Sequence, residues 1–261
     1  MRIDIARLDL RLRTRSIIWF AVGMAAYAYM LIAMYPSVKS DTGLGSLTDN
    51  AAVAAMLGVT GSLTAPPGWV NGNLYANFFP LMVLLMTIGY GASAVAGQSE
   101  DGTLGLVASL PVTRRRLVRE KSLALVLLAV PLALATMSLI LLGRHYELTL
   151  ATGPVVWTTL AILLLGIDFG LLALVIGVVT GSRGLALGLA SAVAAVSYLV
   201  SSLAPIVHWV HAIRPSSLFY WAIGDNQLVT GPSAAGFAVL VAVGVVLHLA
   251  AVALVRRLDI K

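Results

Sequence analysis

The chain has 261 residues, of which 59% are hydrophobic and only 11% are charged, with a formal net charge of +6. Charged residues normally make up about a quarter of a soluble domain, so this composition excludes that class and predicts several membrane-spanning segments with little between them. The sequence contains no cysteine, which excludes a disulfide framework and a thiolate metal site.

The N-terminal segment, residues 1–16, is rich in arginine and precedes a long apolar stretch. This charged region is long, contains two aspartates and has no convincing cleavage site, so we interpret it as retained and not as a signal peptide. Ile5, Leu8 and Leu12 fall on one helical stripe, but Ile3 falls on the other side. We therefore predict an N-terminal interfacial helix at the membrane surface mainly from its position in the chain.

Six apolar segments reach the roughly 20 residues that a membrane-spanning helix needs. In chain order they are Ile17–Tyr35, Ala76–Ala96, Leu123–Leu142, Pro154–Thr180, Leu185–Val207 and Ala234–Val255. A further apolar run, Ala51–Leu63, is too short to span, and we expect it to form an interfacial or re-entrant helix in the first outer loop. The predicted fold class is an all-α membrane protein with six transmembrane helices, forming a single domain over residues 1–261.

Lysine and arginine predict the orientation, because cytoplasmic loops of membrane proteins carry an excess of them. With an even number of spans, both termini lie on one side of the membrane. That side carries 14 of the 17 Lys and Arg residues, and the opposite side carries only Lys39, Arg144 and Arg214. We therefore predict cytoplasmic N- and C-termini in the plasma (inner) membrane. The positive charge then reflects membrane topology, and binding to nucleic acid is not expected.

Polar residues are concentrated between spans two and three, in a predicted cytoplasmic loop at residues 98–121. Gly102 interrupts the preceding helix, and Thr103 can N-cap a new one. Pro111 ends this new helix, Leu104–Leu110, because the residue before a proline is pushed out of the α region. A helix of about two turns is not stable alone. The loop is therefore either an ordinary capped loop or a helix that docks into a soluble partner.

Asp168 is the one acidic residue in the middle of a predicted span. A carboxylate there costs roughly 2.5–3.5 kcal/mol on insertion scales, so it should face a partner or a water-filled cavity. Its neighbours Gly166 and Gly170 have the four-residue spacing that favours close helix approach. Asp168 is therefore either a structural acid at a helix contact or part of the translocation path. If Asp168 lies on such a path, Asp168→Asn should impair transport while leaving assembly intact.

Other residues in the second half of the chain have weaker functional signals. The four-residue glycine spacing recurs on both sides of the GSRG turn between spans four and five, at Gly177, Gly181, Gly184 and Gly188. This predicts tight packing of spans four and five. His208 and His211 have a spacing that could share a metal. Without cysteine or a nearby carboxylate, we interpret them as ordinary interfacial histidines, and we predict no metal site and no catalytic residues.

The loop at residues 98–121 resembles the signature of ABC-2-type permeases, the membrane subunits of one class of ATP-binding-cassette exporter. Its residues 100–121 read EDGTLGLVASLPVTRRRLVREK: an acidic cluster, Gly-Thr-Leu, a short apolar helix, Leu-Pro-Val-Thr, and basic residues before a lysine. Thr113 can also cap the start of span three. In that family the loop is a coupling helix seated in a groove of the nucleotide-binding subunit. The resemblance implies that docking residues are Glu100, Asp101, Gly102, Thr103, Leu104, Val107, Leu110, Pro111 and Arg114.

The chain has no phosphate-binding loop, because none of its three lysines, Lys39, Lys121 and Lys261, follows a glycine-rich pattern. We therefore expect no ATPase site and no cofactor in this chain, with ATP and Mg bound by a partner subunit.

The family resemblance implies a permease that exports a hydrophobic or amphipathic substrate, such as a drug, an antibiotic or a lipid-like molecule. It also implies a dimer of nucleotide-binding subunits, a second permease chain that is the same or related, and contact with membrane lipid. The alternative is a self-contained secondary transporter or channel that uses Asp168, although such proteins favour several intramembrane ionisable groups. An intramembrane enzyme is a third class, but the sequence offers no recognisable catalytic set.

Overall fold

The computed structural model describes residues 4–40, 62, 64–102, 113–205, 207–224 and 227–255, and every regular element in these ranges is helical. Within them, six helices are long and apolar enough to cross a membrane, which confirms the six predicted spans. They are α2 (Thr14–Val38), the continuous segment Pro66–Glu100, α9 (Arg114–Leu142, extended to Tyr146 by a 3-10 turn), α10 (Thr152–Thr180), α11 (Arg183–Leu203) and α15 (Ala234–Leu254).

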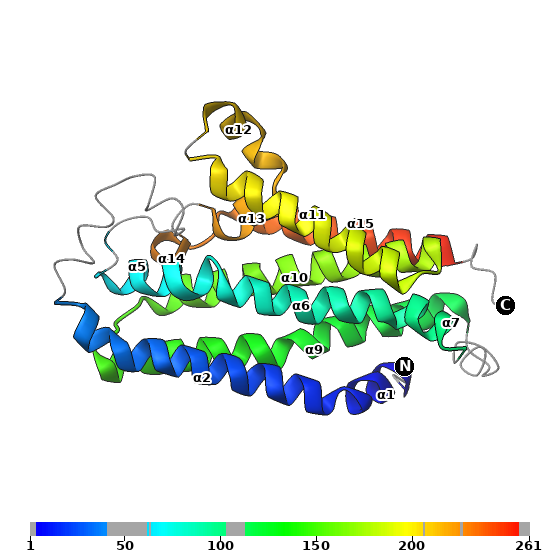
Figure 1. The fold of residues 1–261 in the computed structure, drawn as a ribbon, viewed down its shortest axis with the longest axis horizontal. Coiled ribbons are helices and arrows are strands. Elements are labelled where there is room, and N and C mark those ends of the chain that lie inside the picture. Colours follow the sequence, from blue (N-terminus) through cyan, green and yellow to red (C-terminus); the bar gives the residue numbers. More distant parts are fainter. Residues whose placement is uncertain are drawn as a thin grey trace.

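The long helices run side by side along the long axis of the molecule (Figure 1). Helix α10 lies at the centre and packs against α6 (Phe78–Ala92), α9, α11 and α15, while α2 packs against α9. A short helix, α1 (Asp4–Leu12), and the C-terminal end of α15 lie at the same end of the bundle (Figure 1), which we call the α1 end. The shorter helices α12 (His208–Ile213), α13 (Leu218–Ile223) and α14 (Gln227–Thr230) lie between α11 and α15 in the chain.

The second span is longer than predicted. It begins at Pro66 and contains two π-helical turns, η1 (Asn71–Tyr75) and η2 (Ser93–Gly97), before it ends in α7 (Gln98–Glu100). Side-chain amides bond the carbonyls around η1: Asn73 Nδ2 donates to the Trp69 carbonyl at 2.9 Å, and Asn77 Nδ2 donates to the Gly72 carbonyl at 2.9 Å. These polar residues lower the local hydropathy, so the apolar pattern alone placed the start of the span about three turns late.

Glycines bring α6 and α10 into close contact. A Cβ added at Gly91 would lie 2.0 Å from the Gly170 carbonyl oxygen, and one at Gly166 would lie 2.1 Å from Val83 Cγ1. A Cβ at Gly170 would meet Leu125 of α9 at 2.7 Å. The prediction that Gly166 and Gly170 mark a close helix approach is therefore confirmed.

The four glycines around the turn between α10 and α11 were predicted to pack these two spans tightly. The prediction is right for Gly177 and wrong for Gly181, Gly184 and Gly188. Gly177 packs as predicted, because an added Cβ would lie 3.3 Å from Ala96 Cβ and 3.6 Å from Ala186 Cβ. Gly181 instead ends α10 with a φ of +66°, a left-handed conformation that glycine adopts without strain. Added Cβ atoms at Gly184 and Gly188 would meet no described atom closer than 3.9 Å. The turn is completed by Ser182 Oγ, which accepts a bond from the Leu185 amide at the start of α11.

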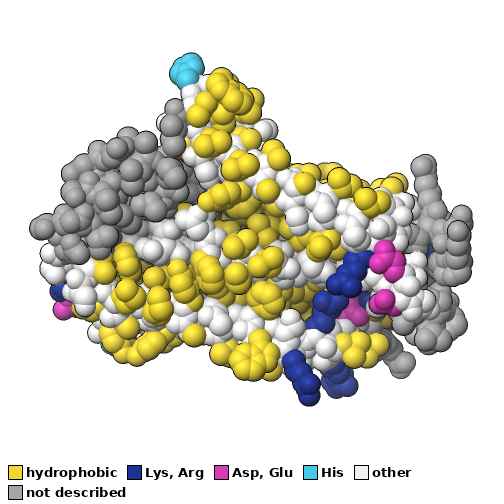
Figure 2. All heavy atoms as spheres, in the orientation of Figure 1, with side chains coloured by type: hydrophobic (Ala, Val, Ile, Leu, Met, Phe, Trp, Pro, Cys, Tyr) yellow, Lys and Arg dark blue, Asp and Glu magenta, His cyan; other side chains and the backbone are white. Residues whose placement is uncertain are grey.

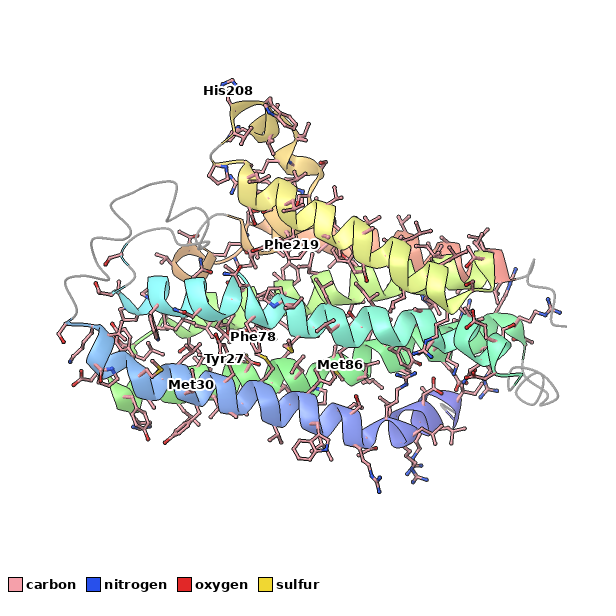
Figure 3. The ribbon with its side chains drawn as sticks, viewed as in Figure 1. Tyr27, Met30, Phe78, Met86, His208 and Phe219 are labelled. Atoms are coloured by element: carbon pink, nitrogen blue, oxygen red, sulfur yellow. The ribbon has the colours of Figure 1, made fainter. Side chains whose placement is uncertain are left out.

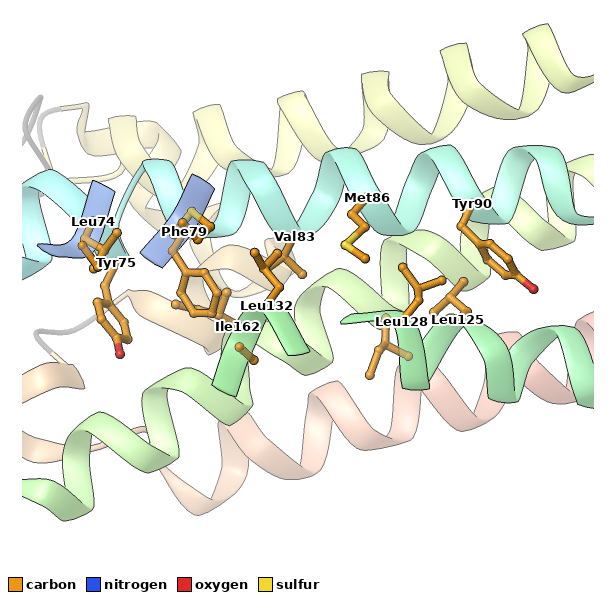
Figure 4. Packing of buried hydrophobic residues seen from close by; sticks show 14 of the residues in the cluster. Leu74, Tyr75, Phe79, Val83, Met86, Tyr90, Leu125, Leu128, Leu132 and Ile162 are labelled. Carbon is orange, nitrogen blue, oxygen red and sulfur yellow. The ribbon is translucent and has the colours of Figure 1, made fainter. Parts of the chain in front are cut away.

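The apolar core lies between α2, α6, α9 and α10. Figure 4 shows side chains from α6 and α9 interdigitating in it, with α10 alongside. The core includes Phe79, Val83 and Met86 of α6, Leu125, Leu128 and Leu132 of α9, Leu74 of η1 and Ile162 of α10. In contrast, only 17% of the most apolar stretch of α11 and 11% of that of α15 are buried. These two helices therefore offer apolar faces to lipid or to another chain.

Helix α1 packs on α9 with only part of its predicted apolar stripe. Ile5 and Ala6 are buried, but Leu8 and Leu12 are 54% and 75% exposed. The stripe of Ile5, Leu8 and Leu12 is thus divided between the protein interior and the outer surface of α1.

Candidate functional site

The structure describes the two ends of the predicted docking loop, residues 98–102 and 113–121, and both lie at the α1 end of the bundle. Gly102 follows α7 with a φ of +68°, which confirms that this residue interrupts the helix. Thr113 Oγ1 accepts a bond from the Arg116 amide and caps α9 as predicted. Glu100, Asp101 and Arg114 are exposed beside these two caps. The predicted coupling helix and the docking residues Thr103, Leu104, Val107, Leu110 and Pro111 lie outside the described residues.

The start of the loop is tied to α11 by Glu100. Its Oε1 accepts a hydrogen bond from the backbone amide of Arg183 at 2.9 Å. Arg183 is the first residue of α11, where backbone amides lack partners within the helix and the helix dipole favours a negative charge. The sequence pointed to Glu100 only as a docking residue, whereas this carboxylate also joins two helices of the same chain.

The end of the loop is tied to α1 by a buried ion pair. Lys121 Nζ lies 2.7 Å from Asp9 Oδ2 and 2.9 Å from Asp9 Oδ1, and the two side chains are only 2% and 8% exposed. Tyr90 of α6 donates its hydroxyl to Asp9 Oδ2 at 2.6 Å. Arg13 lies over the Tyr90 ring, 5.0 Å from its centroid, and donates to Ser93 Oγ at 2.6 Å.

A second acidic residue strengthens the same contact. Glu120 is 1% exposed, and its Oε2 accepts a bond from the Ile5 amide at 2.7 Å, near the start of α1. Its Oε1 accepts a bond from Arg116 Nε at 2.7 Å. The buried charges of α1 and α9 are therefore paired with each other, and the neutral side chains of Tyr90 on α6 and Ser93 on η2 add hydrogen bonds to Asp9 and Arg13. We call this set the α1 junction: Asp9, Arg13, Tyr90, Ser93, Glu120 and Lys121.

Sequence reasoning missed the α1 junction. The loop motif includes Lys121, but nothing in the motif pairs this lysine with an aspartate near the N-terminus. The sequence does contain one indication of such a site. Asp9 and Glu120 lie in helices that pack with one face against the protein, and a carboxylate buried on that face requires a hydrogen-bond or ion-pair partner. The identity of that partner was not visible, because Asp9 and Lys121 are 112 residues apart.

A groove lies on the face of α6 between α2 and α11. Its volume is about 680 Å³. Tyr27 of α2 and Phe78 of α6 lie in one wall (Figure 3), with ring centroids 4.2 Å apart and the rings tilted by 37°, and Phe219 of α13 lines another part. The lining is largely apolar, with polar groups supplied by Asn73, Asn77, Ser191 and Tyr198. Hydrophobic side chains cover much of this face, while Lys and Arg gather toward the α1 end (Figure 2).

Asp168 does not line this groove. It is 1% exposed, and a Cβ added at Gly244 of α15 would lie 2.7 Å from its Oδ1. Neither carboxylate oxygen has a hydrogen-bond partner among the described residues. The structure therefore places this acid at the contact between α10 and α15, and whether it takes part in transport stays a prediction.

His208 and His211 are exposed on α12, which projects from the bundle (Figure 3). In the part of the chain that the structure describes, no three His, Cys, Asp or Glu side chains gather as a metal site.

Comparison with known protein families agrees with the resemblance carried by the loop. The family described as "ABC-2 family transporter protein" matches residues 3–257, which is nearly the whole chain. No curated protein shows a significant match. Since the match includes all six spans and the loop between the second and the third, the chain belongs to the ABC-2 transporter family.

Proposed function

We propose that this ABC transporter permease exports a hydrophobic or amphipathic substrate, driven by a separate ATPase that docks on the loop at residues 98–121. The observation that carries the proposal is the attachment of this loop to the bundle at both ends, by Glu100 to α11 and by Lys121 to α1. A loop fixed in this way can pass a displacement into the membrane helices. The motif and the family match indicate which kind of partner supplies that displacement.

The charge distribution supports a cytoplasmic α1 end, where such an ATPase would bind. Exposed arginines at this end include Arg7, Arg11, Arg15, Arg114 and Arg115. Cytoplasmic surfaces of membrane proteins carry this excess. We therefore propose a plasma (inner) membrane protein with both termini in the cytoplasm.

The groove supports an amphipathic substrate and a second permease chain. Its volume of about 680 Å³ lies within the range of small-molecule sites, and its few polar groups can orient a mostly apolar ligand. Leu81 and Leu85 on its floor are 49% and 54% exposed. A second permease chain, identical or related, placed over this face would cover these leucines and enclose the substrate between two grooves.

The alternative, a self-contained secondary transporter that uses Asp168, has less support. Such a transporter needs its ionisable group in contact with the substrate route. Asp168 instead lies against Gly244, apart from the groove. If Asp168→Asn transports normally in reconstituted vesicles, Asp168 has no part in the mechanism. A loss of transport with intact assembly would instead support a place for Asp168 on the translocation path.

Co-purification tests the proposal directly. The full-length protein should bring down a soluble ATPase. Leu104→Asp or Val107→Asp should release it, because each would bury an unpaired charge in the proposed contact between the coupling helix and the ATPase. Val229→Asp is a matched control, since Val229 of α14 is 49% exposed and lies outside the loop. The permease alone should hydrolyse no ATP. Transport by vesicles that lack nucleotide and ATPase would overturn the proposal.

A further inference from the structure

We infer that the outer face of helix α1 binds the phosphate groups of anionic lipids in the membrane leaflet at the α1 end. In the proposed function, on which this part of the inference rests, that leaflet is the cytoplasmic one. The face carries three arginines in a row and three apolar side chains beside them. We call it the α1 lipid face: Arg7, Leu8, Arg11, Leu12, Arg15 and Trp19.

The arginines of the α1 lipid face lie along one side of the helix. Arg7, Arg11 and Arg15 are spaced by four residues, so successive side chains start about 6 Å apart along the helix axis. Helical hydrogen bonding continues from α1 towards α2, because the Arg13 amide donates to the Asp9 carbonyl at 3.1 Å. The row therefore runs from α1 into the first turn of α2. All three arginines are exposed.

Within the described ranges, no acidic side chain neutralises this row. Asp9 lies on the opposite side of α1, where it is 7% exposed and paired with Lys121. Glu120 is buried against the start of α1. No described residue forms an ion pair with the guanidinium groups of the three arginines. The row therefore carries positive charge that phosphate groups can neutralise through charge-assisted hydrogen bonds.

Apolar side chains adjoin the arginines. Leu8, Leu12 and Trp19 are 54%, 75% and 73% exposed, and at about 100° per residue they fall within about 40° of one another around the helix. Lys and Arg side chains project beside hydrophobic ones at the α1 end (Figure 2). Acyl chains can cover the apolar side chains while the arginines bind the phosphates, which is how amphipathic helices bind a membrane surface. A soluble anion would cover only the arginines.

Trp19 places the face near the depth of the lipid phosphates, because tryptophan is enriched at the membrane–water interface. Arg15 and Arg11 lie one and two turns beyond it, about 6 and 12 Å along the axis, and the headgroup layer is roughly 5–8 Å thick. A long arginine side chain can reach back into this layer. Arg7 lies one turn farther out, within the Debye length of about 8 Å at physiological salt. Arg11 and Arg15 should therefore make the direct contacts.

Quenching by brominated lipids tests this inference on the permease alone. The chain has no native cysteine, so a fluorophore on Ser16→Cys, an exposed position beside the α1 lipid face, would be its only label. The protein is reconstituted in mixed bilayers of phosphatidylglycerol and phosphatidylcholine, with bromine on the acyl chains of one lipid or the other. We expect phosphatidylglycerol to be enriched at the label. Salt at about 1 M should remove most of this enrichment, because the Debye length falls to about 3 Å.

Removal of two arginines should show the same loss. Arg11→Gln with Arg15→Gln should lower the local association constant of phosphatidylglycerol at least roughly fivefold, because one arginine near an anionic surface contributes attraction worth about that factor. Arg11→Lys with Arg15→Lys keeps the charge and should retain most of the enrichment. Lys39→Gln with Arg144→Gln is the matched control: it removes the same charge beyond the far ends of α2 and α9 and should leave the enrichment intact.

Three results would overturn the inference: equal quenching by both lipids in the unmodified protein, full enrichment in Arg11→Gln with Arg15→Gln, or an equal loss in the control pair. If the glutamine pair keeps the enrichment but releases the ATPase, the arginines bind the partner protein instead of lipid. The quenching measurements contain no ATPase. Failure of the unmodified chain to bind any ATPase would therefore overturn the proposed function and leave the lipid result unaffected.

Discussion

Helices α10 and α11 follow each other directly in the chain and are both apolar enough to cross a membrane, yet they occupy opposite environments. In α10, 72% of the most apolar stretch is buried, against 17% in α11. Both contain glycines at four-residue spacing. Those of α10 touch α6 and α9, whereas Gly188 of α11 has no described neighbour within 4 Å. Hydropathy therefore identifies a span, but burial depends on which residues lie opposite its small side chains.

The largest difference in stability between a change at buried α10 and one at exposed α11 should come from adding one methyl group to a glycine. Gly91→Ala places a Cβ 2.0 Å from the Gly170 carbonyl oxygen, a backbone atom that cannot rotate away, so α6 and α10 must separate. We expect a loss of at least ~3 kcal/mol in the free energy of unfolding, the upper end for overpacked cores. Unfolding in mixed micelles measures this loss.

Gly188→Ala is the control for that experiment, because its new methyl group meets no described atom within 4 Å. Its stability should equal or slightly exceed that of the unmodified protein, since alanine favours helix by about 1 kcal/mol over glycine. Equal losses at both positions would show that the α6–α10 contact is not as close as described.

A second prediction concerns the contact between α10 and α15. Gly244→Ala brings a Cβ to 2.7 Å from Asp168 Oδ1, and we expect a loss of about 1–3 kcal/mol. Asp168→Ala removes the opposing atoms, so the double variant should lose less than the sum of the two single variants. Unfolding free energies of the four proteins measure this coupling. Strictly additive losses would mean that the two residues do not touch.

The third prediction concerns the boundary between α10 and α11. Ser182 Oγ accepts the Leu185 amide and caps α11. Ser182→Ala should therefore lower the free energy of unfolding by about 1 kcal/mol, the usual cost of removing an N-cap. Ser182→Asp keeps an acceptor and should restore most of the loss in the same measurement. An unchanged stability in Ser182→Ala would mean that water or another group caps this helix equally well.

Much of this architecture could be predicted from local patterns. The six spans follow from apolar length, and the close approach at Gly166 and Gly170 follows from residue spacing. The start of the second span was misplaced because Asn73 and Asn77, which support a π-helical turn, resemble loop residues in a sequence. Local patterns identify elements, but they do not distinguish a buried polar group with a nearby partner from an exposed one.

The candidate site was harder to predict, because its key contacts are long-range. The loop motif marked the region that includes Glu100 and Lys121. Their partners, Arg183 and Asp9, are 83 and 112 residues away in the chain. Gly181 was misassigned for a related reason: spacing alone cannot separate a glycine that packs from one that ends a helix with a positive φ.

The smallest effect on stability, and the most specific effect on transport, is expected on the exposed helix α11. Ala195 lines the groove and Ala192 does not, although both are exposed on the same helix. Substitutions at such exposed positions usually change the free energy of unfolding by no more than about 0.5 kcal/mol, so Ala195→Trp and Ala192→Trp should both fold. Only Ala195→Trp places an indole ring in the space proposed for the substrate. ATP-dependent uptake into inverted vesicles should therefore fall in Ala195→Trp and persist in Ala192→Trp, and equal uptake by both would place the substrate route elsewhere.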